Sequence, residues 1–140
     1  MVNLNEIQIL ILLKELFDNY GSTLSIHRSF IPEVINLLGR GGAESQFISK
    51  LEEYLINLQK YGDSCIGGKG SAMEHLVGQA PLCSMRFLFS GSNMRVLFVY
   101  QDGIVYILSA FHERAGHKNT EYSKYIPVAK QRFDELKKEG

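Results

Sequence analysis

The stretch from Cys83 to Phe111 constrains the fold more than any other part of the sequence. It predicts three consecutive strands, because its residues are mostly β-branched, aromatic or long apolar ones, which suit a pleated and packed surface. Ser90-Gly91-Ser92-Asn93 has the composition of a turn, and Asp102-Gly103 favours a type I′ hairpin because glycine accepts a positive φ without steric cost. We therefore expect a small antiparallel sheet, with function on one of its faces or edges.

Helical patterns surround this predicted meander. Thr23–Phe30 alternates and predicts a short strand, with His27 at its surface. Pro32 suits the first turn of a helix over Ile31–Leu38. Ala43–Tyr61 predicts an amphipathic helix, because its apolar residues recur at steps of three and four. The order is helix, strand, two helices, three strands and helix, which indicates an α+β domain.

The two terminal helices are less regular. Leu4–Tyr20 is apolar over more than one face, which is typical of a helix buried in its own fold or against a partner, and both readings stay open. Thr120–Lys138 carries a single apolar stripe, but it contains Pro127. We expect the regular helix to begin near Ile126, with Tyr122–Tyr125 as a separate turn.

Length and charge limit the class of protein. A chain of 140 residues with 45% apolar content is the size of one domain with a real core. The fifteen basic and fifteen acidic residues balance, so bulk charge predicts no attraction to nucleic acid or membrane. From Arg86 to Lys130, however, six basic residues stand against three acidic ones, and a local basic patch is compatible with zero net charge.

Other features argue against several classes of site. Cys65 and Cys83 lack paired partners at metal spacing, and without a secretory signal they indicate reduced thiols in a cytoplasmic protein. Gly62–Ser71 is glycine-rich but does not fit the phosphate-binding pattern G-x-x-x-x-G-K-[ST], because Asp63 replaces its first glycine. Ile7–Leu13 is too short to span a bilayer. We expect no metal, no cofactor and no membrane contact.

The ordered series of patterns resembles the RelE/ParE superfamily of bacterial toxin–antitoxin toxins, in particular its phage-derived HigB-like branch. Ala72–Phe89 (AMEHLVGQAPLCSMRFLF) is similar to the family segment K-x-L-x-G…L-x-E-L-R-F. Met94–Phe111 (MRVLFVYQDGIVYILSAF) is similar to its hairpin Y-R-V-x-Y…D-G-x-I-x-L-L-H-x-F. His112–Leu136 is similar to its tail F-x-K-K…K-T-P…I-x-x-A-x-x-R. The resemblance implies a RelE-like domain over residues 22–140, with residues 1–21 as an N-terminal helical extension.

The resemblance also implies a function. RelE-type toxins cut mRNA, usually on the ribosome, and ParE-type members act on DNA gyrase. We expect a metal-independent endoribonuclease, neutralised by a cognate antitoxin, that cleaves mRNA through attack by the 2′-hydroxyl. The alternative is a non-catalytic module of the same fold that inhibits gyrase or only assembles, and the N-terminal helix could support a homodimer.

The candidate site follows from the chemistry of RNA cleavage, which needs a base, an acid and cations for the phosphate. Histidine suits proton transfer near neutral pH and arginine suits phosphate. The expected catalytic residues are Arg86, Arg95, His112 and His117, and the expected RNA-binding residues are Arg114, Lys118 and Tyr122, the last by stacking on a base. The family commonly has Lys where this chain has Glu113. Each of these residues also has an ordinary structural interpretation, in which its side chain is exposed on the sheet, lies in a loop or packs within the fold.

Overall fold

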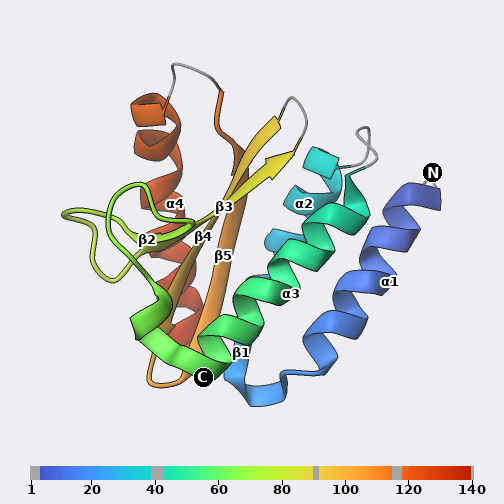
Figure 1. Ribbon diagram of the computed structural model, residues 1–140, viewed down its shortest axis with the longest axis horizontal. Helices are drawn as coiled ribbons and strands as arrows, with labels where there is room; N and C mark the ends of the chain where they lie inside the picture. Colours follow the sequence, from blue (N-terminus) through green and yellow to red (C-terminus); the bar gives the residue numbers. More distant parts are fainter. Residues whose placement is uncertain (1–3, 39–42, 90–91, 115–117, 140) are drawn as a thin grey trace.

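The computed structural model describes residues 4–38, 43–89, 92–114 and 118–139, and it has an α+β architecture (Figure 1). The described helices are α1 (Leu4–Asp18), α2 (Phe30–Leu38), α3 (Glu44–Tyr61) and α4 (Lys118–Glu139), with short 3-10 turns at Gly21–Thr23 and Gly62–Cys65. The described strands are β1 (Leu24–Ile26), β2 (Met73–His75), β3 (Cys83–Phe89), β4 (Ser92–Gln101) and β5 (Ile104–His112).

The sheet is mixed and five-stranded, in the order β1-β5-β4-β3-β2. The three-strand meander is confirmed, and β1 pairs with the last of its strands. The prediction of an antiparallel sheet is wrong at this edge, because β1 runs parallel to β5. It also missed β2, which pairs antiparallel with β3 over only three residues. The Asp102-Gly103 turn is confirmed, since both residues have positive φ, at 55° and 79°.

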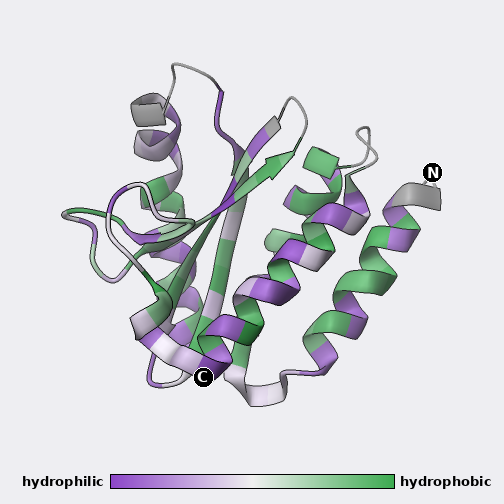
Figure 2. Cartoon of the chain, viewed as in Figure 1, coloured by the Kyte–Doolittle hydropathy of each residue, from purple (hydrophilic) through white to green (hydrophobic). Residues whose placement is uncertain are grey.

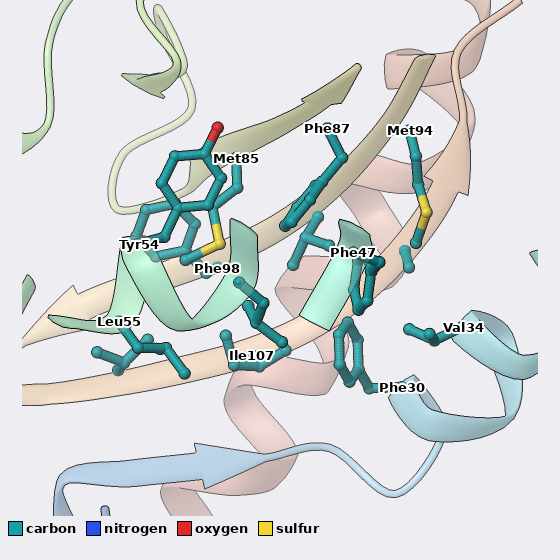
Figure 3. Close-up of a cluster of buried hydrophobic side chains, with 14 of the residues drawn as sticks. Phe30, Val34, Phe47, Tyr54, Leu55, Met85, Phe87, Met94, Phe98 and Ile107 are labelled. Carbon is teal, nitrogen blue, oxygen red and sulfur yellow. The ribbon is translucent and has the colours of Figure 1, made fainter. Parts of the chain in front are cut away.

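The sheet lies between two helical layers (Figure 1). Helices α1, α2 and α3 cover one face, and we call this the three-helix face. Its core contains the aromatic side chains of Figure 3, where Phe87 of β3 packs on Phe47 with ring centroids 4.6 Å apart and on Tyr54 at 5.3 Å. Helix α4 covers the other face, the α4 face, through Tyr122, Ala129 and Leu136.

A β-bulge in β5 controls which side chains reach each face. Leu97 pairs with Ser109, but the next residue of β4, Phe98, pairs with Ile107, so Leu108 has no partner of its own. Successive side chains of a strand alternate between faces, and one extra residue resets that alternation. Accordingly Leu108 and Phe111, three residues apart, both pack on the α4 face.

Helix α1 belongs to the core of the three-helix face. Ile9, Leu13 and Leu16 are buried there, while Ile7 and Ile11 are exposed. Apolar residues run along most of α1 in Figure 2, in contrast to the mixed surface of α3. The core reading of this helix is therefore confirmed for one of its sides, and its exposed side keeps two isoleucines. Along the described chain, no helix is long and apolar enough to cross a bilayer.

Two local predictions about the α4 region are wrong. Helix α4 is continuous through Pro127, where a break was expected. Proline removes one backbone hydrogen bond, to the carbonyl of Ser123, and both residues lie on the exposed side of α4, where solvent reaches that carbonyl. His27, expected at the surface, is buried, and its Nε2 lies 2.8 Å from Glu135 Oε1 of α4.

Candidate functional site on the α4 face

Arg86 and Arg95 stand directly opposite each other on β3 and β4. Arg95 lies on the same side of β4 as Leu97 and Val99, which pack under α4. Cross-strand partners project to the same side of a sheet, so both arginines belong to the α4 face. Like charges in this position repel each other, and nearby carboxylates are expected to compensate them.

Arg95 is compensated by two buried glutamates. Its side chain is only 6% exposed. Its Nε lies 3.3 Å from Glu113 Oε1, its Nη2 donates to Glu113 Oε2 at 3.4 Å, and its Nη1 lies 4.0 Å from Glu74 Oε1. Glu113 also accepts a 2.7 Å hydrogen bond from Asn93 Nδ2, and Glu74 accepts one from the Gly70 amide at 3.1 Å. The guanidinium that was expected to bind phosphate is thus paired within the protein.

Tyr122 joins this cluster from α4. Its hydroxyl lies 2.9 Å from Ser84 Oγ, and both side chains are buried. Burial raises the pKa of Tyr122; the hydrogen bond between Tyr122 and Ser84 and the charge of Arg95 oppose that rise. Tyr122 therefore acts as a neutral hydroxyl within reach of the charges of Arg95, Glu113 and Glu74. We call Ser84, Arg86, Arg95, Glu74, Glu113 and Tyr122 the arginine cluster.

Arg86 differs from Arg95 in having no ion-pair or side-chain hydrogen-bond partner among the residues that the structure describes. It is half-buried and lines a groove of about 530 Å³ between α3 and the end of β3, together with Lys50, Tyr54 and Leu88. The Tyr54 hydroxyl donates to the Arg86 carbonyl, and burial raises the pKa of Tyr54 to about 12. The groove therefore holds an arginine beside a neutral phenol, and none of the described carboxylates pairs with that arginine.

His112 does not join the arginine cluster. It pairs with Met94, a core residue of the three-helix face, so its side chain leaves the sheet on the side opposite to Arg95. It borders a separate hollow of about 250 Å³ that Arg114 and Tyr125 also line. Arg114 is largely exposed and donates to Glu121 Oε1 at 3.2 Å. The structure thus separates two groups that the sequence placed in one site.

Two predicted residues are not located by the structure. His117 lies outside the described residues, and Lys118 begins α4 without a described side chain. Among the seven predicted site residues, Arg95 and Tyr122 come together, Arg86 stands opposite Arg95 and lines the groove beside α3, and His112 and Arg114 share the second hollow.

The sequence analysis did not predict that Glu74 and Ser84 belong to the arginine cluster. Glu74 lies on the short strand β2 and is buried, which is unusual for a glutamate without a partner. It also borders a hollow of about 430 Å³, lined by Lys69, His75 and Tyr122 as well. The alternation of β3 could have placed Ser84 beside Arg86, but nothing local to Met73–His75 identifies it as a strand.

The cysteines are separate thiols. Cys83 is buried and its Sγ lies 3.4 Å from His75 Nδ1, and burial raises the pKa of Cys83 to about 12. Asp63 lies 3.5 Å from the other ring nitrogen of His75. A buried thiol with a raised pKa is a poor nucleophile, so this row of groups does not make a thiol catalyst. Within the described ranges, no cluster of three or more His, Cys, Asp or Glu side chains is placed to hold a metal ion.

Comparison with known proteins identifies no relative: no family model, no curated protein and no solved structure matches the chain.

Proposed function

We propose that this chain is a RelE/ParE-type toxin of a toxin–antitoxin pair, with a RelE-like fold, that acts on mRNA as a metal-independent endoribonuclease. The element order that suggested the resemblance, with a strand, two helices, a meander and a C-terminal helix, agrees with the order of the elements in the structure. This agreement supports the proposal at the level of architecture, and function has to be argued from the site.

The observation that carries the proposal is that Arg95 and Tyr122 come together on the α4 face, with Arg86 opposite Arg95 on the neighbouring strand. These residues come from three separate elements, β3, β4 and α4, and each has a side chain suited to RNA chemistry. Two arginines on neighbouring strands suit the charge of adjacent phosphates, because the guanidinium donates parallel hydrogen bonds. Arg86 has no ion-pair partner within the described ranges, so it is the arginine of the pair that is available to a phosphate.

In the proposed reaction, the 2′-oxygen of the RNA attacks the adjacent phosphorus while a base takes its proton. The bond from phosphorus to the 5′-oxygen breaks, and an acid protonates that oxygen. The products are a cyclic 2′,3′-phosphate and a free 5′-hydroxyl. The arginines would stabilise the negative charge that develops on the phosphorane.

We also propose partners and a cellular location for this protein. A cognate antitoxin would neutralise the protein, the ribosome would present the mRNA, and both would be met in the cytoplasm. The exposed Ile7 and Ile11 of α1 give the N-terminal helix an apolar side on which a homodimer could form.

A second candidate is a non-catalytic RelE/ParE-fold module that binds a target such as gyrase. Two observations favour it over catalysis. The charge of Arg95 is already neutralised by Glu113 and Glu74. His112, the expected group for proton transfer, projects from the opposite face of the sheet.

Induced expression in bacteria tests the two candidates. Growth and the 5′ ends of cellular mRNA are followed for the wild type, for Arg86→Ala and for Arg28→Ala. Arg86 is half-buried and pairs with no carboxylate in the part of the chain that the structure describes, so its substitution removes the proposed phosphate ligand without breaking a described ion pair. Arg28 is the matched control, because it is 72% exposed at the far end of β1.

If the chain is a ribonuclease, we expect the wild type and Arg28→Ala to arrest growth and to produce new 5′-hydroxyl ends on mRNA. We expect Arg86→Ala to lose most of both effects. Growth arrest with intact mRNA would support the binding module instead. Normal growth with a folded, abundant wild-type protein would refute the toxin proposal.

A further inference from the structure

The contact between Glu113 and Arg95 has the form of a phosphate contact. The two carboxylate oxygens of Glu113 face Nε and Nη2 on one side of the guanidinium, at 3.3 and 3.4 Å. Two oxygens of a phosphate bind a guanidinium through the same pair of nitrogens. Glu113 is placed there by the end of β5, where its amide donates to the Asn93 carbonyl at 2.7 Å.

We propose that Glu113 is an internal substitute for the RNA phosphate, which keeps Arg95 unavailable until a competing phosphate displaces the Glu113 carboxylate. This inference rests on the proposed function and deepens it, because it assigns a regulatory contact to the same cluster. It makes Arg95 a latent phosphate ligand and Glu113 its autoinhibitory partner.

The charges around Arg95 explain why displacement is required. Its single positive charge faces two carboxylates, Glu113 and Glu74, and all three side chains are more than 90% buried. A phosphate that approached Arg95 in this state would meet a net negative charge, and repulsion in a buried site is strong. Neutralising Glu113 would leave Glu74 and Arg95 balanced, with the free charge of Arg86 on the neighbouring strand.

The contact between Arg95 and Glu113 is weak, as it must be if a phosphate is to displace the carboxylate. The 3.3 Å contact lacks the alignment of a hydrogen bond, so Arg95 Nε and Glu113 Oε1 have no hydrogen-bond partner within the described part of the chain. The 3.4 Å bond is long for a charged pair, for which about 2.7–2.9 Å is usual. The strongest restraint on the carboxylate is Asn93, whose side chain is half-buried at the start of β4.

Binding of a short single-stranded 2′-O-methyl RNA, measured by fluorescence anisotropy at fixed salt, tests this inference. Such RNA lacks the attacking hydroxyl, so cleavage plays no part in the readout. The variants are Glu113→Gln, which keeps the shape and removes the charge, and the double variant Glu113→Gln with Arg95→Met. The matched control is Glu121→Gln, another buried carboxylate, which pairs with Arg114.

We expect Glu113→Gln to bind on the order of tenfold more tightly than the wild type, because one charged hydrogen-bonded contact is gained. Glu121→Gln should stay within about twofold of the wild type. Adding Arg95→Met should abolish the gain. Asn93→Ala removes the hydrogen bond that Asn93 donates to the same carboxylate and should give a smaller gain of the same sign, which decides the matter if Glu113→Gln does not fold.

The inference is overturned if neither Glu113→Gln nor Asn93→Ala binds more tightly. It is equally overturned if Glu121→Gln gives the same gain, or if the gain survives Arg95→Met, because the effect would then be general charge. A protein that shows the expected gain but cuts no RNA would refute the ribonuclease and leave the Glu113 contact established as an inhibitory one.

Discussion

The stability of the arginine cluster can be predicted from its burial. Arg95→Met keeps most of the side-chain length but removes the charge that compensates Glu74 and Glu113. Both carboxylates are at least nine-tenths buried, so water can replace the lost contact only by opening the structure. Breaking a buried ion pair in this way costs about 3–5 kcal/mol of the free energy of unfolding. That is a large part of the stability of an ordinary domain.

Urea denaturation followed by circular dichroism measures this loss. Arg28→Met is the control, because its ion pair with Glu135 is 3.8 Å long and largely exposed, and we expect about 0.5 kcal/mol or less. The triple variant Arg95→Met, Glu74→Gln, Glu113→Gln should recover most of the lost stability, since it leaves no uncompensated charge. A loss below about 1 kcal/mol for Arg95→Met alone would refute the reasoning.

Three shorter predictions concern other parts of the fold. At pH 8.5, iodoacetamide should modify Cys65 well before Cys83, because Cys83 is buried and its pKa is raised to about 12; mass spectrometry of the peptides measures the order. The hydrogen bond from His27 lowers the pKa of Glu135, so its contribution to stability is present above the ordinary carboxyl range and is lost as pH falls through the lowered pKa. Urea midpoints of the wild type and Glu135→Gln should therefore converge in acid. Phe87→Ala should cost about 3–5 kcal/mol in the same denaturation assay, since this fully buried ring fills the core of the three-helix face.

The parts of the fold that depend on local sequence could be predicted. The meander, the Asp102-Gly103 hairpin, α2 and α3 each have a signal within a few residues, and all are found close to the expected positions. Strand β2 could not be predicted, because three residues carry too little pattern and their pairing with β3 is a contact between distant segments.

The site was predicted less well than the fold, for a specific reason. Plain alternation along β5, counted from Tyr106 and Leu108 on the α4 face, would place His112 on that same face. The bulge at Leu108 reverses this placement, and no residue type marks a bulge of this kind in the sequence. The pairing of Arg95 with Glu113 depends on the same shift.

The bulge has a consequence for how this sequence could vary. Leu108 has no partner in β4, so the pairs of Leu97 with Ser109 and of Phe98 with Ile107 would simply become consecutive if it were absent. A deletion of that single codon would therefore restore regular alternation along β5 and leave His112 and Glu113 on their present sides. The contact of Glu113 with Arg95 would thus tolerate the loss of one residue from β5, as long as the lost residue is the unpaired one.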